Sequence, residues 1–565
     1  MKHIGLVLLA VLSLSYTSDA SSDIRWSSTG GGWRAMVADQ GFANLFAQAG
    51  LIGPDATTPF SSIAGNSGGS WFATQFFYSQ EFYEKTTGDP EVLRDFVQSW
   101  MDSYLKLTEA LPTDSDLCKP IPEIPLFGPT KDMCNVFAAY DGDWSAFIMA
   151  MLQQASTDYG DADFPSRIAN RSNQVQDLQD VDMLIQTTVA PQSRVRSQGT
   201  DVMIGPNDLE EMYAVVLPAM YASSSSDFTI GGGNNLQAYT SSASDSFRFS
   251  DYDDYYLYPG TNGSLYANDT ENHKRLRGTS SSGDISPTGS VRTPFGGATP
   301  SVSQLASISS AAMGLYSGSV PSSLAQTASV YREDIKDSEL GFVKKRLALE
   351  GLDRLTNTLY QLPLFDDLAI CSQYPSPCGT TDFRFLDGGF TDNPSFAQNI
   401  ANYQASENYN PDEPLKMVLT NTNHASMDSE YEQSMILSYF NTTFNKDIEP
   451  GKFVWAPGQS TPWASSQIFQ ESLNWNGLNA LLQPVENSDF TTAILSGTTL
   501  DNPIFGTRSG LHVDILLINI NNDIPNTVVG VDNINKYTPG LVNLAYEIAT
   551  NQELLERVQL FFESS

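Results

Sequence analysis

Histidine, cysteine and positive charge are scarce in this sequence. Its 565 residues include 4 histidines and 4 cysteines, and 65 acidic residues outnumber 30 basic ones. The formal charge of −35 at pH 7 argues against nucleic acid or an anionic surface as a partner bound through charge. The cysteine spacings and the few histidines do not form a zinc ligand set, so we expect no metal and no cofactor.

Long apolar runs are also missing beyond the N-terminus. Residues 4–14 form the one pronounced run, which follows Lys2 and His3 and precedes the small-residue sequence Ser18-Asp19-Ala20. This pattern predicts a signal peptide over residues 1–20, with a retained N-terminal anchor as the alternative. No later stretch has the length and apolarity of a membrane span. We therefore expect a secreted protein, extracellular or in the lumen of the secretory or lysosomal-vacuolar pathway.

The cysteines and the glycosylation sequons fit this route. An even number of cysteines in a secreted chain suggests two disulfides, for which three pairings are possible. The most economical pairs close local loops, namely Cys118 with Cys134 and Cys371 with Cys378. Asparagine is followed by the acceptor pattern for N-glycosylation at four positions, which are Asn170, Asn262, Asn268 and Asn441.

The order of predicted elements indicates the fold class. Residues 24–77 read as strand, glycine turn, helix, strand, turn and helix, which favours a mostly parallel or mixed sheet with helices on both faces, a three-layer α/β/α arrangement. Further strands are predicted at 183–189, 213–217, 382–386, 415–420 and 512–520, and helices at 334–362 and 541–562. We expect one large domain over 21–565, with a Ser-, Gly- and Tyr-rich insertion at about 221–310 that forms either a lid or surface loops.

A candidate nucleophile lies in Gly65-Asn66-Ser67-Gly68-Gly69. The G-x-S-x-G pattern places a serine on a strained turn between a strand and a helix, where flanking glycines allow close backbone packing. An apolar run precedes the motif and a predicted helix follows it, as this turn requires. The alternative interpretation is an ordinary glycine-rich turn.

A second glycine motif precedes the serine. Gly30, Gly31 and Gly32 lie between a predicted strand and a predicted helix, where exposed backbone N–H groups can bind an oxyanion. Arg34 adds a fixed positive charge suited to a phosphate or to a developing anion. The alternative is a tight turn beside a surface arginine.

The base that activates the serine is the remaining requirement. Beyond residue 20 the histidines are His273, in the predicted insertion, His424, after a predicted strand, and His512, at the start of one. Asp387 ends the predicted strand 382–386 and is followed by Gly388 and Gly389. A strand end is where a carboxylate reaches a site at the edge of a sheet, so Asp387 is the favoured base, and a triad using His424 or His512 is the alternative.

These motifs resemble those of the secreted fungal lysophospholipases (phospholipase B) and of the cytosolic phospholipase A2 catalytic domain, relatives of the patatins. The family pattern is G-G-G-x-R-A-M, then A-G-x-S-G-G-S-W, then D-x-G followed by asparagine and proline. Here it reads Gly30 to Met36, Ala64 to Trp71, and Asp387-Gly388-Gly389 with Asn393-Pro394. The chain departs from the pattern at Asn66, where the family usually has an apolar residue, and in carrying far fewer cysteines than the fungal enzymes.

The resemblance implies a patatin-like fold and a Ser–Asp dyad without histidine. Ser67 would be the nucleophile and Asp387 its partner, Gly31 and Gly32 would form the oxyanion hole, and Arg34 would stabilise the substrate phosphate. The implied activity is hydrolysis of the carboxyl esters of phospholipids or lysophospholipids at a membrane or micelle interface. We expect no calcium-binding docking domain before Gly30.

Two alternatives stay open, a triad lipase or esterase and a catalytically lapsed binding or storage protein of the same fold. Oligomeric state is left open. Because a carboxylate base has an ordinary pKa of about 4, the dyad predicts activity that survives below about pH 5.5.

Overall fold

Segments from both ends of the chain build one central sheet. The computed structural model describes residues 23–54, 56–111, 132, 135–136, 139–140, 144–192, 217–230, 255–256, 266–267, 299–310, 382–422, 434–440, 453–454, 463–464, 467–502 and 505–563. Within these residues the main sheet is 10-stranded, in the order β12-β13-β14-β9-β1-β2-β3-β4-β5, with β8 paired to β3.

The central strands are parallel and the outer ones antiparallel. The parallel group runs from β14 through β9, β1 and β2 to β3, whereas β12, β13, β4, β5 and β8 pair antiparallel with their neighbours. The strands of the sheet are β1 (Ile24–Ser28), β2 (Ser62–Asn66), β3 (Asp182–Gln192), β4 (Leu217–Ala222), β5 (Asp227–Ile230), β8 (Asp382–Asp387), β9 (Leu415–Asn421), β12 (Gln483–Pro484), β13 (Phe490–Thr498) and β14 (His512–Ile520). Two small ribbons lie apart, β6 (Tyr255–Tyr256) with β7 (Tyr266–Ala267), and β10 (Phe453–Val454) with β11 (Trp463–Ala464).

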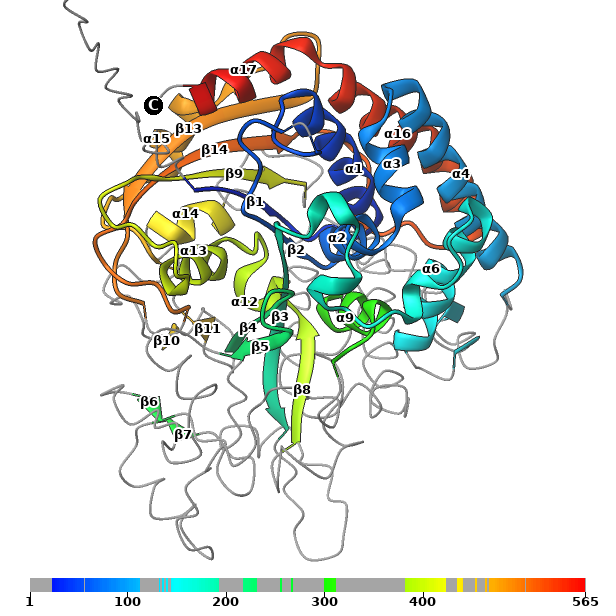
Figure 1. Ribbon diagram of the computed structural model, residues 1–565, viewed down its shortest axis with the longest axis horizontal. Helices are drawn as coiled ribbons and strands as arrows, with labels where there is room; N and C mark the ends of the chain where they lie inside the picture. The colour runs from blue at the N-terminus through cyan, green and yellow to red at the C-terminus, as the bar shows by residue number, and fades with distance from the viewer. Residues whose placement is uncertain are drawn as a thin grey trace, which may run out of the picture.

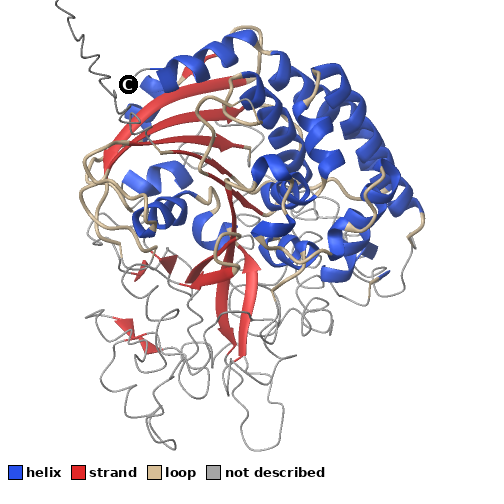
Figure 2. Ribbon diagram, viewed as in Figure 1, coloured by secondary structure: helices blue, strands red, loops and turns tan. Residues whose placement is uncertain are grey.

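Helices cover both faces of the sheet, as Figures 1 and 2 show. On one side lie α1, α16 and α17, with α3 and α4 packed outside them, and on the other side lie α13 and α14. The helices are α1 (Gly32–Gln48), α2 (Gly68–Tyr78), α3 (Gln80–Thr87), α4 (Pro90–Glu109), α6 (Trp144–Tyr159), α9 (Val302–Ser309), α12 (Gly389–Asp392), α13 (Phe396–Ala405), α14 (Ser434–Phe440), α15 (Trp475–Leu481), α16 (Val531–Thr550) and α17 (Gln552–Glu563), with short 3-10 turns at Phe164–Ser166, Arg171–Asn173 and Gln176–Leu178. The expected three-layer α/β/α class with a mostly parallel, mixed sheet is confirmed.

Aromatic side chains fill the space between the sheet and the first helices. Trp26 of β1 is fully buried and contacts the rings of Phe46, Phe60 and Phe72, with ring centroids 4.9 to 6.1 Å apart. Such large rings dominate the apolar area that the fold removes from water, about 150–250 Å² each. Strand β1 and helix α2, which adjoin the glycine and serine motifs, are therefore anchored in this buried aromatic cluster. No helix in the described part of the chain combines the length and the apolarity that crossing a membrane requires.

Two expectations about individual elements need revision, and a third is not tested. The region expected to be loops or insertion at 221–310 contains the end of β4, strand β5 and helix α9, and these belong to the sheet and its helical cover. The predicted C-terminal helix at 541–562 is two helices, α16 and α17, separated at Asn551. The helix predicted at 334–362 lies outside the described residues.

Candidate active site

Topology brings the serine and aspartate motifs together. Strand β2 pairs with the first half of β3, and its last residue, Asn66, lies opposite Gln186. Strand β8 pairs with the second half of β3 in the opposite direction, and its last residue, Asp387, lies opposite Thr187. Both strands occupy the same edge of β3, so their carboxyl ends face each other end to end. Figure 1 shows this meeting point where β2 reaches β3 and β8.

Ser67 occupies the sharp turn that the sequence predicts. Its backbone has φ 50° and ψ −120°, a conformation that L-residues rarely adopt, and helix α2 begins at the next residue. A Cβ atom on Gly65 would lie 2.6 Å from the carbonyl oxygen of Gly69, which explains why glycine flanks the serine. The turn leaves Ser67 only partly buried, at the N-terminus of α2.

The glycine loop lies directly against this turn. Gly31 and Gly32 have φ of 152° and 54°, and a Cβ on Gly68 would overlap the carbonyl oxygen of Gly32. Among the described residues, the N–H groups of Gly31 and Gly32 have no hydrogen-bond acceptor, whereas the next N–H, that of Trp33, donates to the Asn526 carbonyl at 3.1 Å. Two N–H groups beside a serine, at the N-termini of two helices that pack together, are the kind of donors from which an oxyanion hole is built.

Asp387 is the acidic partner at this point. Its side chain is 7% exposed, and its Oδ1 accepts a hydrogen bond of 2.8 Å from the N–H of Gly389. The polar side chains of Ser67 and Asn66 lie close to the carboxylate and favour its ionised form. Burial raises the pKa of Asp387 to about 6, and these groups oppose part of that shift. The structure thus places a carboxylate with a near-neutral pKa on the candidate nucleophile.

Arg34 lies behind the glycine loop. Its side chain has no exposed surface, and Nη2 donates to the carbonyl oxygen of Ile520 at the end of β14, 2.9 Å away. Burial lowers the pKa of Arg34 to about 10, so it keeps its charge at neutral pH. In this arrangement the guanidinium connects the first turn of α1 to the end of β14. The phosphate contact that the family resemblance implies stays a prediction.

The histidine alternatives divide by position in the sheet. His512 is half-exposed at the amino end of β14, where it pairs with Asp514 at 3.2 Å. Strands β14, β9, β1 and β2 are parallel. His512 lies at the amino ends of these strands, whereas Ser67 follows the carboxyl end of β2. It therefore does not reach the serine. His273 and His424 lie outside the described residues.

Most of the predicted covalent modifications also fall outside the described chain. This applies to Cys118, Cys134, Cys371 and Cys378 and to the sequons at Asn262, Asn268 and Asn441. Asn170 is described, and its Oδ1 accepts hydrogen bonds from Ser172 and Asn173 at the start of a 3-10 turn. The disulfides and the glycans remain predictions.

Two residues of the site escaped the sequence analysis. Ser309, at the end of α9, accepts the N–H of Ser67 at 3.0 Å and donates to the Gln186 carbonyl at 2.5 Å. Asp39 is fully buried in α1 beneath the serine turn, where it accepts the Ser28 hydroxyl at 2.6 Å. Burial raises the pKa of Asp39 to about 8, which makes it a neutral support at pH 7. Neither Ser309 nor Asp39 lies in a glycine-containing motif, so the sequence gives no signal that marks them as site residues.

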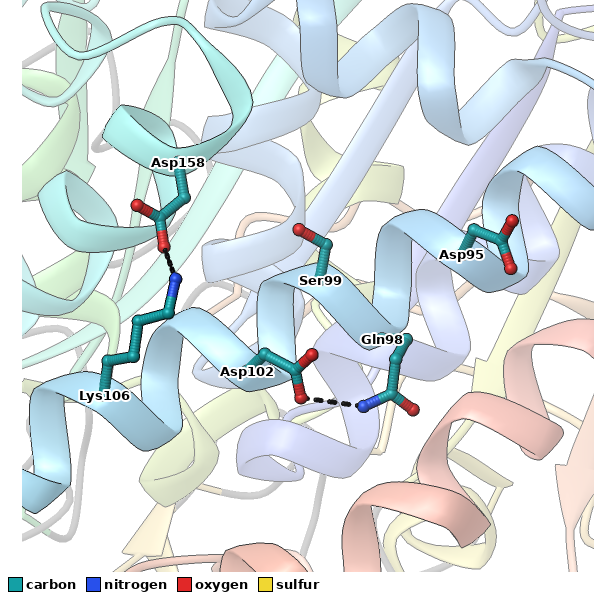
Figure 3. Close-up of a pocket in the computed structure, with 6 residues that line it drawn as sticks. All are labelled: Asp95, Gln98, Ser99, Asp102, Lys106 and Asp158. Carbon is teal, nitrogen blue, oxygen red and sulfur yellow. Dashed lines mark hydrogen bonds and ion pairs between the residues drawn. The ribbon is translucent and has the colours of Figure 1, made fainter.

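A surface pocket of about 510 Å³ lies elsewhere, between α4 and α6 (Figure 3). Its lining is acidic, and its one lysine, Lys106, is paired with Asp158 at 2.7 Å. It contains none of the motif residues. Within the described part of the chain, no three His, Cys, Asp or Glu side chains are grouped closely enough to hold a metal ion.

Comparison with known proteins gives distant structural similarity and no similarity in sequence. No protein-family model matches the sequence, and no curated protein matches it. Among solved structures, the chain is similar to human GIVD cytosolic phospholipase A2, with a TM-score of 0.39 and 9% identity over 97% of this chain. The same enzyme in complex with methyl gamma-linolenyl fluorophosphonate gives a TM-score of 0.36 at 9% identity over 97% of this chain. The match spans 63% and 60% of the length of those two chains.

Proposed function

We propose that this protein is a lipid acyl hydrolase that cleaves the carboxyl esters of phospholipids or lysophospholipids outside the cytosol. The observation that carries the proposal is the contact of a buried carboxylate, Asp387, with Ser67 on a strained turn that faces the glycine loop. The lipid class and the phosphate come from the resemblance of the three motifs to the phospholipase families. The extracellular or lumenal location comes from the predicted signal peptide and sequons.

Acylation begins with proton transfer from the Ser67 hydroxyl to the Asp387 carboxylate. The serine oxygen then attacks the ester carbonyl carbon, and the negative charge that develops on the carbonyl oxygen is stabilised by the N–H groups of Gly31 and Gly32. Arg34, charged and buried behind the loop, lowers the energy of that anion through the low-dielectric interior. When the tetrahedral intermediate collapses, the C–O bond to the glycerol breaks and the leaving oxygen takes the proton from Asp387.

Deacylation follows the same steps with water as the nucleophile. Asp387 accepts a proton from a water molecule, which attacks the acyl-serine carbonyl, and the same N–H groups stabilise the second tetrahedral intermediate. Breakage of the bond to the serine oxygen releases the fatty acid, and Ser67 recovers its proton from Asp387. Both half-reactions use one carboxylate as base and then as acid, so a histidine is not required.

Hydrolysis of a diacyl phospholipid, its lyso form and a phosphate-free ester tests the proposal. We expect the wild type to cleave a phosphate-bearing lipid, and Ser67→Ala and Asp387→Asn to lose at least about 10⁴-fold in kcat, because nucleophile and base act as one unit. His424→Ala and His512→Ala serve as the controls and should keep wild-type rates. Loss of activity in His424→Ala would establish the triad instead, and equal rates for the wild type and Ser67→Ala would remove the assignment.

A further inference from the structure

The three motifs are joined through one amide that the family pattern does not supply. Asn66 is fully buried, and its Nδ2 donates to Oδ1 of Asn393 at 2.8 Å and to the Asn393 carbonyl at 3.3 Å. The same two oxygens of Asn393 accept the N–H of Gly30, at 3.2 and 3.1 Å. Asn66 therefore links the serine turn to the glycine loop through a shared partner from the segment that follows Asp387.

Packing around this amide is tight on every side. A Cβ on Gly30 would lie 2.6 Å from Asn393 Oδ1 and 2.9 Å from Asn66 Nδ2, and a Cβ on Gly388 would overlap Asn66 Oδ1. Ser309 of α9 directs its hydroxyl to Asn66 Oδ1 at 3.4 Å. The position admits a side chain of this shape and leaves it little freedom to move.

We propose that Asn66 is a positioning residue, which holds the Asp387 carboxylate and the glycine loop in register with Ser67 through its buried amide. The inference rests on the proposed function. The amide donates two hydrogen bonds to Asn393, which in turn holds the N–H of Gly30 at the start of the glycine loop, and its oxygen lies against Gly388, the residue that follows Asp387. An apolar side chain at this position, as in the related families, supplies neither bond. This chain therefore uses its own device to align base, nucleophile and oxyanion hole.

The surroundings of Asp387 make its pKa sensitive to the side-chain amide of Asn66. The groups of neighbouring elements that face the carboxylate or its turn are neutral, namely Ser67, Ser309 and Gln186. The next carboxyl along the segment, Asp392, is occupied by the N–H groups of Phe396 and Gln398 and by the Tyr439 hydroxyl. Among the described residues, burial raises the pKa of Asp387, and the neutral hydrogen-bonding groups of Gly389, Ser67 and Asn66 are what favour its ionised form.

Two variants and a matched control test the proposal. Asn66→Leu introduces the apolar type of the related families, and Asn66→Asp keeps the shape but removes the amide donor. Asn44→Leu is the control, because Asn44 is a fully buried amide with two backbone acceptors, the carbonyls of Thr86 and Gly88, away from the site. Each variant is compared with wild type in kcat and KM on a lysophospholipid, and in the rate of Ser67 labelling by a fluorophosphonate from pH 4.5 to 8.

We expect both Asn66 variants to lose about 10- to 100-fold in kcat and in labelling rate, with KM within about twofold, because the buried hydrogen bonds to Asn393 and the alignment that they maintain are lost. We expect the acid limb of the pH profile to move upward by about half a pH unit or more, since the carboxylate loses a donor. Asn44→Leu should unfold at a lower temperature while keeping the wild-type kcat and acid limb.

If Asn66→Leu folds and keeps the wild-type kcat and acid limb, the proposal is overturned. It is also overturned if neither Asn66 variant folds, because Asn66 would then be a determinant of folding. The labelling assay separates this result from the fate of the proposed function. Wild-type protein that is labelled at Ser67 but hydrolyses no lipid contradicts the substrate, while the labelling rates still decide the role of Asn66. Wild-type protein that is not labelled contradicts both.

Discussion

Asp387 combines two demands that oppose each other at the level of a single residue. It must be ionised to take the proton of Ser67, yet its burial disfavours the charge and raises its pKa to about 6. The N–H of Gly389 and the side chains of Ser67 and Asn66 compensate part of this effect. The sequence identifies the aspartate, but the degree of burial depends on how β8 and β2 meet on β3, which no local pattern reveals.

This burial changes the expected pH dependence. From the ordinary pKa of a carboxylate, the sequence predicts activity that survives below about pH 5.5. With a pKa raised to about 6, the active ionised form is present above pH 6 and is lost as the pH falls through that value. We therefore expect kcat/KM to fall tenfold per pH unit below about pH 6 and to be flat above about pH 7. A profile that stays flat down to pH 5 would contradict this.

A pH profile no longer distinguishes the dyad from a histidine base, because an ordinary histidine titrates near pH 6.5. Substitution of His424 is therefore the experiment that distinguishes the dyad from a triad. His512 needs no such test, because it lies at the opposite ends of the parallel strands from Ser67.

At the level of elements, the site is a junction of two helix N-termini. Helices α1 and α2 begin at Gly32 and Gly68, and their first turns are packed together by the rings of Trp33 and Trp71, whose centroids lie 5.0 Å apart. Aligned helix dipoles place partial positive charge at such ends. On the proposed mechanism, the junction supplies electrostatic support to an oxyanion from backbone groups that are fixed before substrate binds.

Gly68→Ala should disrupt this junction, because the added Cβ would overlap the Gly32 carbonyl. We expect a loss of more than about 2 kcal/mol in the free energy of unfolding, as for other overpacked sites, and a loss of at least about 100-fold in kcat in the protein that still folds. Urea unfolding and lysophospholipid turnover measure the two effects. Gly477→Ala is the control, since its Cβ would meet the flexible end of Leu473 at 3.1 Å and Asn474 Oδ1 at an ordinary contact distance of 3.5 Å. Equal losses in the two variants would show that the contact has no special role.

The strands that carry the site residues were mostly predictable from the sequence. Helix α9, which packs against the site, and the pairing of β8 with β3 were not. Strands β9 and β14 are largely apolar, a short apolar run leads into β2, and β1 and β8 alternate apolar with polar residues, so their positions follow from the sequence. Helix α9 was hidden because its region is rich in serine, although Ser301 and Gln304 form a capping box at its start. The pairing of β8 beside β2 depends on tertiary packing, so the contact of Asp387 with Ser67 required the structure.

At the scale of the whole molecule, the predicted route through the secretory pathway is open to direct test. Expression of the full chain in a eukaryotic secretory host should release protein into the medium with its N-terminus at Ser21, because the predicted cleavage site ends at Ala20. Treatment with an N-glycosidase should lower its mass, and Asn170→Gln should remove one glycan. Protein that stays in the cell with residues 1–20 attached would contradict the proposed location.

The end-to-end meeting of β2 and β8 has a consequence for the chain as it is made. Asn66 and Asn393, which hydrogen-bond across this junction, are separated by 327 positions in sequence. At about 5–20 residues per second, roughly 300 residues take on the order of 15–60 seconds to synthesise. During that interval a nascent chain holds its serine and glycine loop without its base. On the proposed mechanism, the growing protein is inert toward the lipids of the membrane beside which it folds, and hydrolysis cannot begin before β8 has paired with β3 and brought Asp387 to the serine turn.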